Sequence, residues 1–361
     1  ANRLYGFTAQ RTLQIAQTLY EQRKLISYPR TDSRYVSKTV EATFSAISNA
    51  VTPRYDPALI ASGTGTRPLS TRFVDDSRVS DHHAILPTQT RAPDDLPPDE
   101  KKIYDLICRR FLTSWHGDHV FAVTTVITAI RDGEIVDRYS SSGTSIEVEG
   151  WKVLDIKLGP AKSSSSKPDE PTLPGGLTKG MPRKVLEAKA IPKKTRPPPR
   201  LTDATLLTAM ETAGRTLDEK EMSEAMRERG LGTPATRASI LETLLKREYI
   251  VRDGKMLSAT DKGIGLSAIV HAHVKSPAMT GEWEAKLGRI ERGEEQLDTF
   301  MEAIEAYVRE VVGTVAASKA SLPEIPRRLG GTETELARRS ERAAEVPREA
   351  RSAPAIAIAK P

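Results

Sequence analysis

Residues 26–35 read ISYPRTDSRY, and the interpretation of the whole chain starts from this stretch. Its main feature is the hydroxyl of Tyr28, followed closely by the guanidinium of Arg30. A tyrosine hydroxyl is almost wholly neutral at neutral pH, and it is a weak nucleophile unless positive charge lies nearby. Arg30 supplies a permanently charged, planar guanidinium whose N–H groups match the oxygens of a phosphate. Pro29 limits the motion of the backbone between the two residues. The stretch therefore predicts attack on a phosphodiester, against the plainer alternative of a buried strand tyrosine with Asp32 as a helix cap.

The sequence resembles type IA DNA topoisomerases, and most of all their bacterial topoisomerase III branch. Five blocks carry the resemblance, in the order expected for that family, and they span residues 1 to about 312. The blocks are residues 4–33 (LYGFTAQRTLQIAQTLYE and, after three residues, LISYPRTDS), 80–88 (SDHHAILPT), 196–207 (RPPPRLTDATLL), 230–240 (GLGTPATRASI) and, more weakly, 277–284 (PAMTGEWE). Five ordered blocks are not expected by chance, so the chain is identified as a member of this family.

The resemblance implies a multidomain α+β fold, in which winged-helix-like helical domains accompany a β-rich gate or hinge domain around a DNA-sized hole. It places a nucleophile-bearing, winged-helix-like domain in residues 1–119. A β-rich gate or hinge segment with a basic, Pro- and Ser-rich insertion is expected in residues 120–200. A helical, winged-helix-like DNA-binding domain follows in residues 201–312. Residues 313–361, rich in Ala, Arg and Glu, are expected to form a weakly ordered tail.

Hydrophobic periodicity and turn residues predict the elements of these domains. The expected helices are 8–23 with Thr8 as its cap, 37–50, 99–115, a helix starting near Leu201 with caps from Thr202 and Asp203, and 236–248. Runs of β-branched residues predict strands at 25–28, 123–130 and 147–158, with Asp-Gly hairpins at 131–134 and 249–257. Loops are expected over residues 51–79.

The charge of the chain suits a polyanionic partner. The net charge is +6 and the pI is about 9.2, which is a mild bias for this length. Residues 162–200 hold ten Lys and Arg against three Asp and Glu, which indicates either a solvated linker or an auxiliary DNA track. The single cysteine, Cys108, excludes an intrachain disulfide and a Cys-based zinc ribbon, and it is expected in the core. No apolar run approaches the length of a membrane span, so a membrane partner is not expected and the protein is expected in the cytoplasm, on the nucleoid.

The resemblance implies that Tyr28 is the nucleophile of a transesterification on one DNA strand. A 5′-phosphotyrosine forms, the 3′-hydroxyl leaves, and the reverse attack reseals the strand without ATP. The sequence holds no Gly-x-x-x-x-Gly-Lys-Ser/Thr motif, which agrees. Such an enzyme relaxes negative supercoils or unlinks DNA through single-stranded regions. Arg30 is expected to stabilise charge on the phosphate, with a surface ion pair as its alternative. His82 matches the family's active-site histidine, and it is expected to donate to a phosphate oxygen or to organise the leaving group.

Six further residues are expected to contact DNA, chiefly single strands. Backbone N–H groups and threonine hydroxyls before the helix at 236–248 would hold a phosphate, and the alternative is a plain Gly-rich turn with Thr236 as an N-cap. The side chain of Arg237 is the strongest candidate for a contact with the DNA backbone. The six residues are His83, Arg34, Gly232, Thr233, Thr236 and Arg237.

A zinc site built from the four histidines His82, His83, His116 and His119 is disfavoured, because no Cys joins them and their spacing fits no standard set. No metal site is therefore expected within the chain. Members of the family carry an N-terminal metal-binding (Toprim) domain with a catalytic Glu and an Asp-x-Asp-x-Glu cluster. The sequence holds no Asp-x-Asp and opens inside the first matching block.

The chain is therefore expected to be a fragment that lacks this domain, and Mg²⁺ is expected to bind there in the complete enzyme. The missing domain is an expected partner, and the chain alone is expected to be inactive. One alternative is a non-cleaving, single-stranded DNA-binding module with the same fold. A tyrosine recombinase is a more distant alternative, disfavoured because its dispersed Arg and His residues are not evident.

Overall fold

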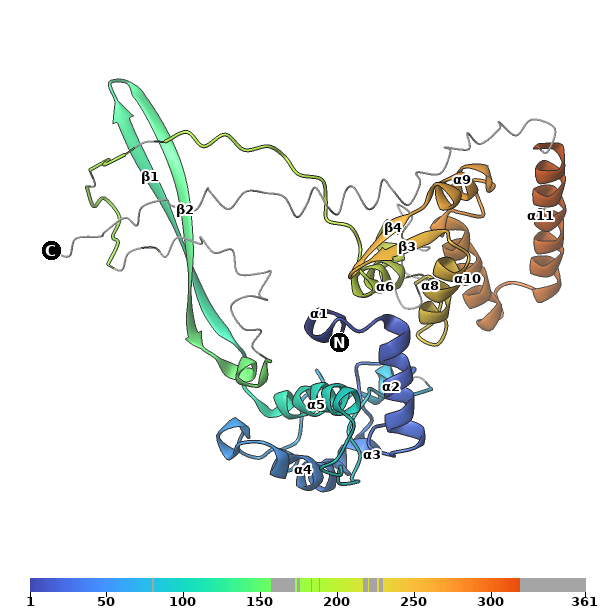
Figure 1. Ribbon diagram of the computed structural model, residues 1–361, viewed down its shortest axis with the longest axis horizontal. Helices are drawn as coiled ribbons and strands as arrows, with labels where there is room; N and C mark the ends of the chain where they lie inside the picture. Colours follow the sequence, from blue (N-terminus) through green and yellow to red (C-terminus); the bar gives the residue numbers. More distant parts are fainter. Residues whose placement is uncertain are drawn as a thin grey trace, which may run out of the picture. The chain divides into compact units, whose positions relative to one another are not determined.

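The computed structural model describes residues 1–79, 81–156, 173, 176–182, 184–187, 189–216, 220, 226 and 230–318 (Figure 1). Contacts divide the chain into two compact units, residues 1–297 and 298–361. Helix α11 (Leu297–Ser318) begins at the last residue of the first unit, and its residues 298–318 are the described part of the second. The helix continues past the boundary expected at residue 312. The four-domain division remains a prediction. None of the helices in the described ranges combines the length and the apolar character needed to cross a bilayer.

The first unit begins with a short helix, α1 (Asn2–Tyr5), and the longer α2 (Ala9–Glu21). The predicted cap of α2 is confirmed, because the Thr8 hydroxyl accepts the backbone N–H of Arg11 at 3.1 Å. Helix α2 packs on α5 (Pro98–Leu112). The helices predicted at 8–23 and 99–115 are thus confirmed, with the last three residues of the second forming the 3₁₀ turn η4 (Thr113–Trp115).

The core of this part of the unit is aromatic at its centre. The rings of Phe44, Phe111 and Trp115 meet edge to face, with centroid distances of 5.5, 5.5 and 4.8 Å. Burying each such ring stabilises the fold by roughly 1.5–3 kcal/mol. Cys108 is fully buried on α5, as predicted. Burial raises the pKa of the Cys108 thiol to about 12, so the thiol stays protonated and behaves as a small apolar residue.

The single helix predicted over residues 37–50 is wrong, because the chain forms two helices there. They are α3 (Lys38–Glu41) and α4 (Phe44–Val51). The break lies at Thr43, whose backbone N–H and hydroxyl both donate to the Val40 carbonyl, at 2.9 and 2.7 Å. A threonine that bonds the backbone of the preceding turn competes with the regular helical bond. Loops follow as predicted, interrupted by three 3₁₀ turns, η1 (Thr52–Arg54), η2 (Pro57–Leu59) and η3 (Asp76–Arg78).

The strand predicted over residues 25–28 is also wrong in extent. It is reduced to a single antiparallel bridge between Ile26 and Pro87. The ladder does not continue past Ser27, because the Leu86 N–H donates to the Ser27 hydroxyl at 2.9 Å and not to the Ser27 carbonyl.

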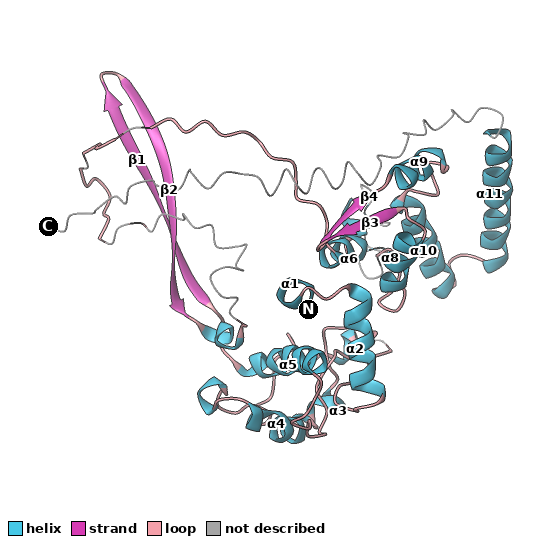
Figure 2. Ribbon diagram, in the orientation of Figure 1, coloured by secondary structure: helices cyan, strands magenta, loops and turns pink. Residues whose placement is uncertain are grey.

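A long antiparallel hairpin, β1 (Val120–Asp132) and β2 (Ile135–Val148), forms a two-stranded ribbon (Figure 2). The strand predicted at 123–130 is confirmed and extended, and the turn places Gly133 at a φ of +59°. Of the strand predicted at 147–158, only the first two residues lie in a strand, because β2 ends at Val148 and the 3₁₀ turn η5 (Gly150–Leu154) follows. Residues 157 and 158 lie outside the described residues. The role of the ribbon in a gate or hinge remains a prediction.

The rest of the first unit is a helical segment with one small hairpin. The helix and hairpin predicted over 236–257 are confirmed as α8, β3 and β4. The elements are α6 (Asp203–Glu211), η6 (Ala213–Thr216), α8 (Arg237–Lys246), β3 (Ile250–Asp253), β4 (Met256–Ala259), α9 (Asp261–Ile269) and α10 (Pro277–Glu291). The cap predicted for α6 is confirmed, because Thr202 forms a capping box with Thr205.

Asp203 is not the second cap that the sequence suggested. Its side chain is 2% exposed, pairs with Arg252 at 3.0 Å, and accepts the backbone N–H of Ala9 at 2.9 Å. The carboxylate therefore joins α6, β3 and the first turn of α2.

Asp203→Asn is expected to destabilise the chain by about 2 kcal/mol, because it removes one charge of a buried pair and leaves the other imperfectly compensated. The measurement is the midpoint of urea unfolding. Asp253→Asn is the matched control, since Asp253 is exposed at the end of β3. Equal midpoints for the two variants would show that the Asp203 contacts do not hold these elements together.

Candidate active site

Two of the sequence blocks lie side by side and shape one loop. The Ser27 N–H donates to the Leu86 carbonyl at 2.8 Å, and the Leu86 N–H donates to the Ser27 hydroxyl at 2.9 Å. The Ser27 hydroxyl also donates to the Ala84 carbonyl at 3.2 Å, and the Ala84 N–H donates to the Tyr35 carbonyl at 2.8 Å. Ala84 thus anchors both ends of the loop formed by residues 28–34, which we call the Tyr28 loop.

Tyr28 is half-buried between two other rings. Its ring centroid lies 4.4 Å from that of His82, with an interplanar angle of 43°. On α2, Tyr20 meets Tyr28 edge-on at 5.5 Å and 78°. The ammonium of Lys24 lies 5.7 Å from the Tyr20 ring and adds a cation beside this cluster. The contacts position the phenol ring and bring together a tyrosine and a histidine from two distant blocks.

Arg30 carries a guanidinium that is not neutralised by any described carboxylate. Its Nε is buried and has no hydrogen-bond partner within the described part of the chain. A buried donor left unsatisfied costs about 1–3 kcal/mol, and an anion near the guanidinium would offset that cost. The alternative of an ordinary surface ion pair is therefore not formed among the described residues. The side chain suits a phosphate oxygen.

The two adjacent histidines differ in their surroundings. The His82 ring is exposed and lies on Tyr28, while its backbone carbonyl accepts the Thr31 hydroxyl at 3.2 Å. The half-buried His83 uses Nδ1 to donate to the Ala84 carbonyl at 2.7 Å. His82 is therefore placed for chemistry with Tyr28, whereas His83 is engaged with the backbone of its own block. Ser80, the first residue of that block, lies outside the described residues.

Arg34, at the end of the Tyr28 loop, pairs with Glu211 of α6 at 3.1 Å. The two side chains are 82% and 47% exposed, so the pair contributes at most about 1 kcal/mol. A phosphate can therefore compete with Glu211 for this guanidinium. The sequence singled out Arg34 but gave no signal for its carboxylate partner.

A cavity of about 730 Å³ lies against the Tyr28 loop, and sequence reasoning missed most of its charged residues. Arg34, Arg72, Arg110 and His116 line it, and Asp118 pairs with Arg72 at 3.0 Å. Arg72 and Arg110 lie in segments outside the five blocks, where no local pattern distinguishes them from ordinary surface cations. Arg34 and Arg72 each pair with one carboxylate, so Arg110 leaves the cavity with a small positive excess, which favours an anionic ligand.

In the turn at residues 230–237, backbone N–H groups are bonded to other groups of the same turn. Gly230 and Gly232 have φ values of +63° and +68°, and a Cβ at Gly230 would lie 2.6 Å from a backbone carbonyl oxygen. The Thr236 hydroxyl accepts the Thr233 N–H at 2.9 Å, and the N–H groups of Thr236 and Arg237 both donate to the Thr233 carbonyl at 3.0 Å. These three N–H groups, expected to hold a phosphate, are thus already bonded. Contacts with DNA would have to come from side chains of this turn.

The described contacts join Tyr28 with His82 and Tyr20, and they do not join the 230–237 turn to the Tyr28 loop. Helix α8, which follows the turn, packs on α2, the helix that carries Tyr20. The Arg237 Nε donates to the Leu231 carbonyl at 3.2 Å. The DNA contacts predicted for Gly232, Thr233, Thr236 and Arg237 remain predictions. Part of the basic segment 162–200 lies outside the described residues.

Three of the four histidines weighed as zinc ligands, His83, His116 and His119, bond to backbone carbonyls, and the ring of His82 lies on Tyr28. His116 Nε2 donates to the Leu59 carbonyl at 3.1 Å, and His119 Nδ1 donates to the Glu149 carbonyl at 3.0 Å. Within the described ranges, no three His, Cys, Asp or Glu side chains gather into a group that could hold a metal ion.

Comparison with known proteins gives consistent matches. A family model described as DNA topoisomerase matches residues 1–302. Proteins named DNA topoisomerase 3 from Bacillus anthracis and Shouchella clausii are each 35% identical to the chain, over 325 and 335 residues. These matches cover 88% and 89% of the chain, but only 44% and 43% of the two relatives.

The structure of full-length topoisomerase I from Thermotoga maritima also matches, with a TM-score of 0.56 at 23% identity. The match covers 86% of this chain and 47% of that one, and it shows a shared fold. The chain thus spans less than half the length of each of these three proteins.

Proposed function

Because the chain belongs to the type IA DNA topoisomerase family, we propose that it supplies the tyrosine nucleophile and part of the single-stranded DNA path of such an enzyme. The complete enzyme would break one strand, pass DNA through the gap and rejoin the strand without ATP. It would thereby relax negative supercoils or unlink DNA, acting on the nucleoid.

The proposed reaction starts with the Tyr28 hydroxyl. Its oxygen attacks the phosphorus, the Oη–P bond forms, and the bond from phosphorus to the 3′-oxygen breaks. The 3′-oxygen takes a proton and leaves as a hydroxyl, and the 5′-phosphate stays on Tyr28. The reverse attack by the 3′-hydroxyl restores the strand, since the bond energy is kept in the phosphotyrosine.

Arg30 and His82 have separate parts in this proposal. Arg30 would hold a non-bridging phosphate oxygen as negative charge develops, because its guanidinium has no carboxylate partner among the described residues. His82 would donate a proton or a hydrogen bond to a phosphate oxygen or to the leaving oxygen. The observation that carries the proposal is the contact of the His82 ring with Tyr28 at 4.4 Å.

Mg²⁺ is expected for the complete enzyme, but the described residues do not fit it. Their carboxylates do not gather into a metal-binding group, and Mg²⁺ prefers several oxygen ligands in octahedral geometry. In the complete enzyme, the ion would bind in the expected N-terminal metal-binding domain.

The purified 361-residue chain is expected to bind single-stranded DNA and to leave it uncleaved, with or without Mg²⁺. Affinity should fall steeply as salt rises, because Lys and Arg contacts with phosphates release counterions. Fluorescence anisotropy with a labelled oligodeoxythymidine measures binding, and a denaturing gel of the same mixtures measures cleavage. Adding the expected metal-binding domain in trans should restore some cleavage if the two pieces dock. Efficient relaxation of a supercoiled plasmid by the chain alone would contradict this expectation, because it would show that the chain needs no further domain for the essential chemistry.

A further inference from the structure

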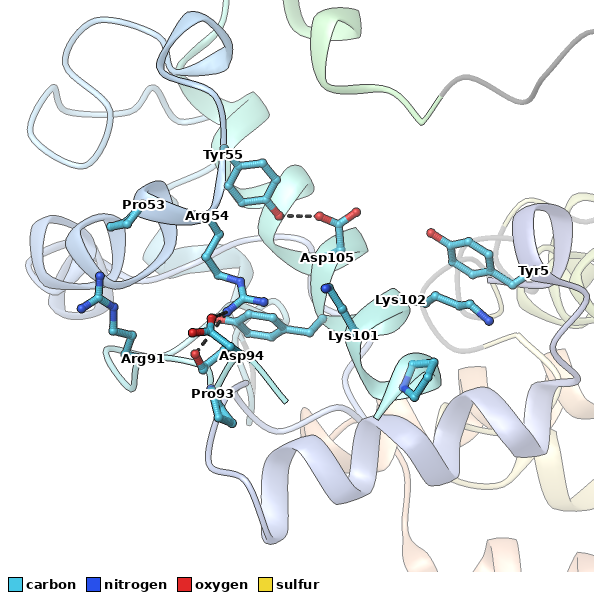
Figure 3. Close-up of a pocket in the computed structure, with 13 residues that line it drawn as sticks. Tyr5, Pro53, Arg54, Tyr55, Arg91, Pro93, Asp94, Lys101, Lys102 and Asp105 are labelled. Carbon is cyan, nitrogen blue, oxygen red and sulfur yellow. Dashed lines mark hydrogen bonds and ion pairs between the residues drawn. The ribbon is translucent and has the colours of Figure 1, made fainter. Parts of the chain in front are cut away.

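A second hollow of the first unit shares no lining residue with the cavity at the Tyr28 loop. It is an open groove of about 1060 Å³ between the segments 53–55 and 91–94 and the first turns of α5 (Figure 3). In the view of Figure 3, Arg91 lies at one end of the groove and Lys102 at the other, with Arg54 and Lys101 between them.

The groove carries an excess of positive charge. Arg91 and Lys101 are exposed and make no ion pair with any residue that the structure describes. Two carboxylates also line the groove, but the charge of Asp105 is already engaged by Arg109 at 2.7 Å and by the Tyr55 hydroxyl at 2.7 Å. Asp94 is fully exposed and lies 3.8 Å from Arg54, so it compensates little. The surface therefore attracts an anion.

Tyr104 forms part of the wall of the groove. Its side chain is 2% exposed, and its hydroxyl oxygen is buried beside the Cys108 thiol. The Arg54 guanidinium lies 6.0 Å from the Tyr104 ring centroid. The ring therefore helps to position Arg54, and the contacts with an anion would come from the cations of the groove.

The aromatic faces of the groove favour a backbone ligand over stacked bases. The ring of Tyr104 is covered by Arg54, and the ring of Tyr5 has the Lys102 ammonium at 5.6 Å. Rings already occupied by cations do not offer a free platform for a base, whereas spaced cations along an open groove suit successive phosphates.

One wall of the groove also lies close in the sequence to the active-site block at residues 80–88. Thr88, the last residue of that block, donates its hydroxyl to the Lys24 carbonyl at 2.6 Å, just before the Tyr28 loop. Arg91, at one end of the groove, comes three residues later.

We propose that this groove binds the sugar–phosphate backbone of single-stranded DNA, as a contact additional to the Tyr28 loop. The proposal rests on the function proposed above, since it assigns the ligand class of that function to a second surface.

The test compares two labelled oligodeoxythymidines on the 361-residue chain, one of about 6 nucleotides and one of about 20 nucleotides. The double variant Arg91→Gln/Lys101→Gln should lower affinity for the long strand by about tenfold and leave affinity for the short strand unchanged. For the long strand, the salt dependence should become weaker: the magnitude of the slope of log affinity against log salt should decrease by about 1.4, because two phosphate contacts are lost and each contributes about 0.7. Arg131→Gln/Arg138→Gln on the β1–β2 ribbon is the control, with the same change in net charge.

Each outcome either supports or overturns the proposed groove. Loss for the long strand alone, absent in the control, supports the groove. An equal loss in the control shows an effect of net charge and overturns the proposal, as does an unchanged affinity for both strands. An equal loss for both strands shows that the groove is not a separate contact and also overturns it. If the parent chain binds neither strand, the proposed function itself fails, which is distinct from failure of the groove alone.

Discussion

Tyr28→Phe is expected to abolish the covalent protein–DNA adduct while single-stranded DNA binding survives. The variant is to be tested in an extended protein in which the expected metal-binding domain precedes Ala1. The substitution removes one hydroxyl and keeps the ring that packs against His82 and Tyr20. The loop should therefore keep its shape, because its anchors are contacts of Ser27 and Ala84 rather than of the phenol. Only the nucleophile is lost, so adduct formation should fall below detection.

The control is Tyr20→Phe, which removes a hydroxyl from the neighbouring ring of the same cluster. It should form adduct at close to the parental level. The readout is a denaturing gel of protein with end-labelled DNA. An adduct at parental level in Tyr28→Phe would remove this residue from the mechanism.

His82→Ala is expected to slow cleavage and religation by roughly 10²-fold, within the range for a positioned proton donor. The reason is the contact of its exposed ring with Tyr28, at 4.4 Å between centroids. His83→Ala should affect the rates less, because the ring of His83 bonds to the Ala84 carbonyl. Single-turnover cleavage of a labelled strand measures both variants.

The adjacent histidines serve as controls for one another. His83→Ala removes a hydrogen bond within the block, so its effect should appear mainly as a loss of stability to unfolding, of about 1 kcal/mol. If His83→Ala slows cleavage more than His82→Ala does, the roles assigned to these two positions are reversed.

The local elements of this chain could be predicted because their causes are local. Thr8 and Thr202 have capping side chains next to helical periodicity, and both cap helices as expected. The β1–β2 ribbon was predicted from its β-branched half and from the Asp-Gly turn that follows it. Its partner strand contains a Ser-Ser-Ser-Gly run, and it becomes a strand through pairing with β1 rather than through its own pattern.

Errors arose where particular hydrogen bonds and ion pairs, and not periodicity, decide the outcome. The break at Thr43 depends on which carbonyl a hydroxyl selects, and periodicity does not report that choice. Asp203 resembles a helix cap in the sequence, but its carboxylate forms an ion pair with Arg252 and accepts the N–H of Ala9. The bridge at Ile26 is short because the Leu86 N–H bonds to the Ser27 hydroxyl and not to the backbone carbonyl.

The candidate site was predicted in part. The motif singled out Tyr28 and His82 and the structure brings their rings into contact, whereas the ring of Tyr20 and the cavity residues Arg72 and Arg110 were missed. Their places depend on how α2 and α5 pack, and no signal near them in the sequence encodes that packing.

The most direct test of the central claim is to locate the covalent link in the extended protein. The adduct is trapped with denaturant on single-stranded DNA, digested with nuclease and protease, and mapped by mass spectrometry. The expected product is the peptide that carries Tyr28, joined through the tyrosine oxygen to the 5′-phosphate of a nucleotide, with no other tyrosine modified. A modification on Tyr35, on Tyr20 or on any residue outside the Tyr28 loop would contradict it.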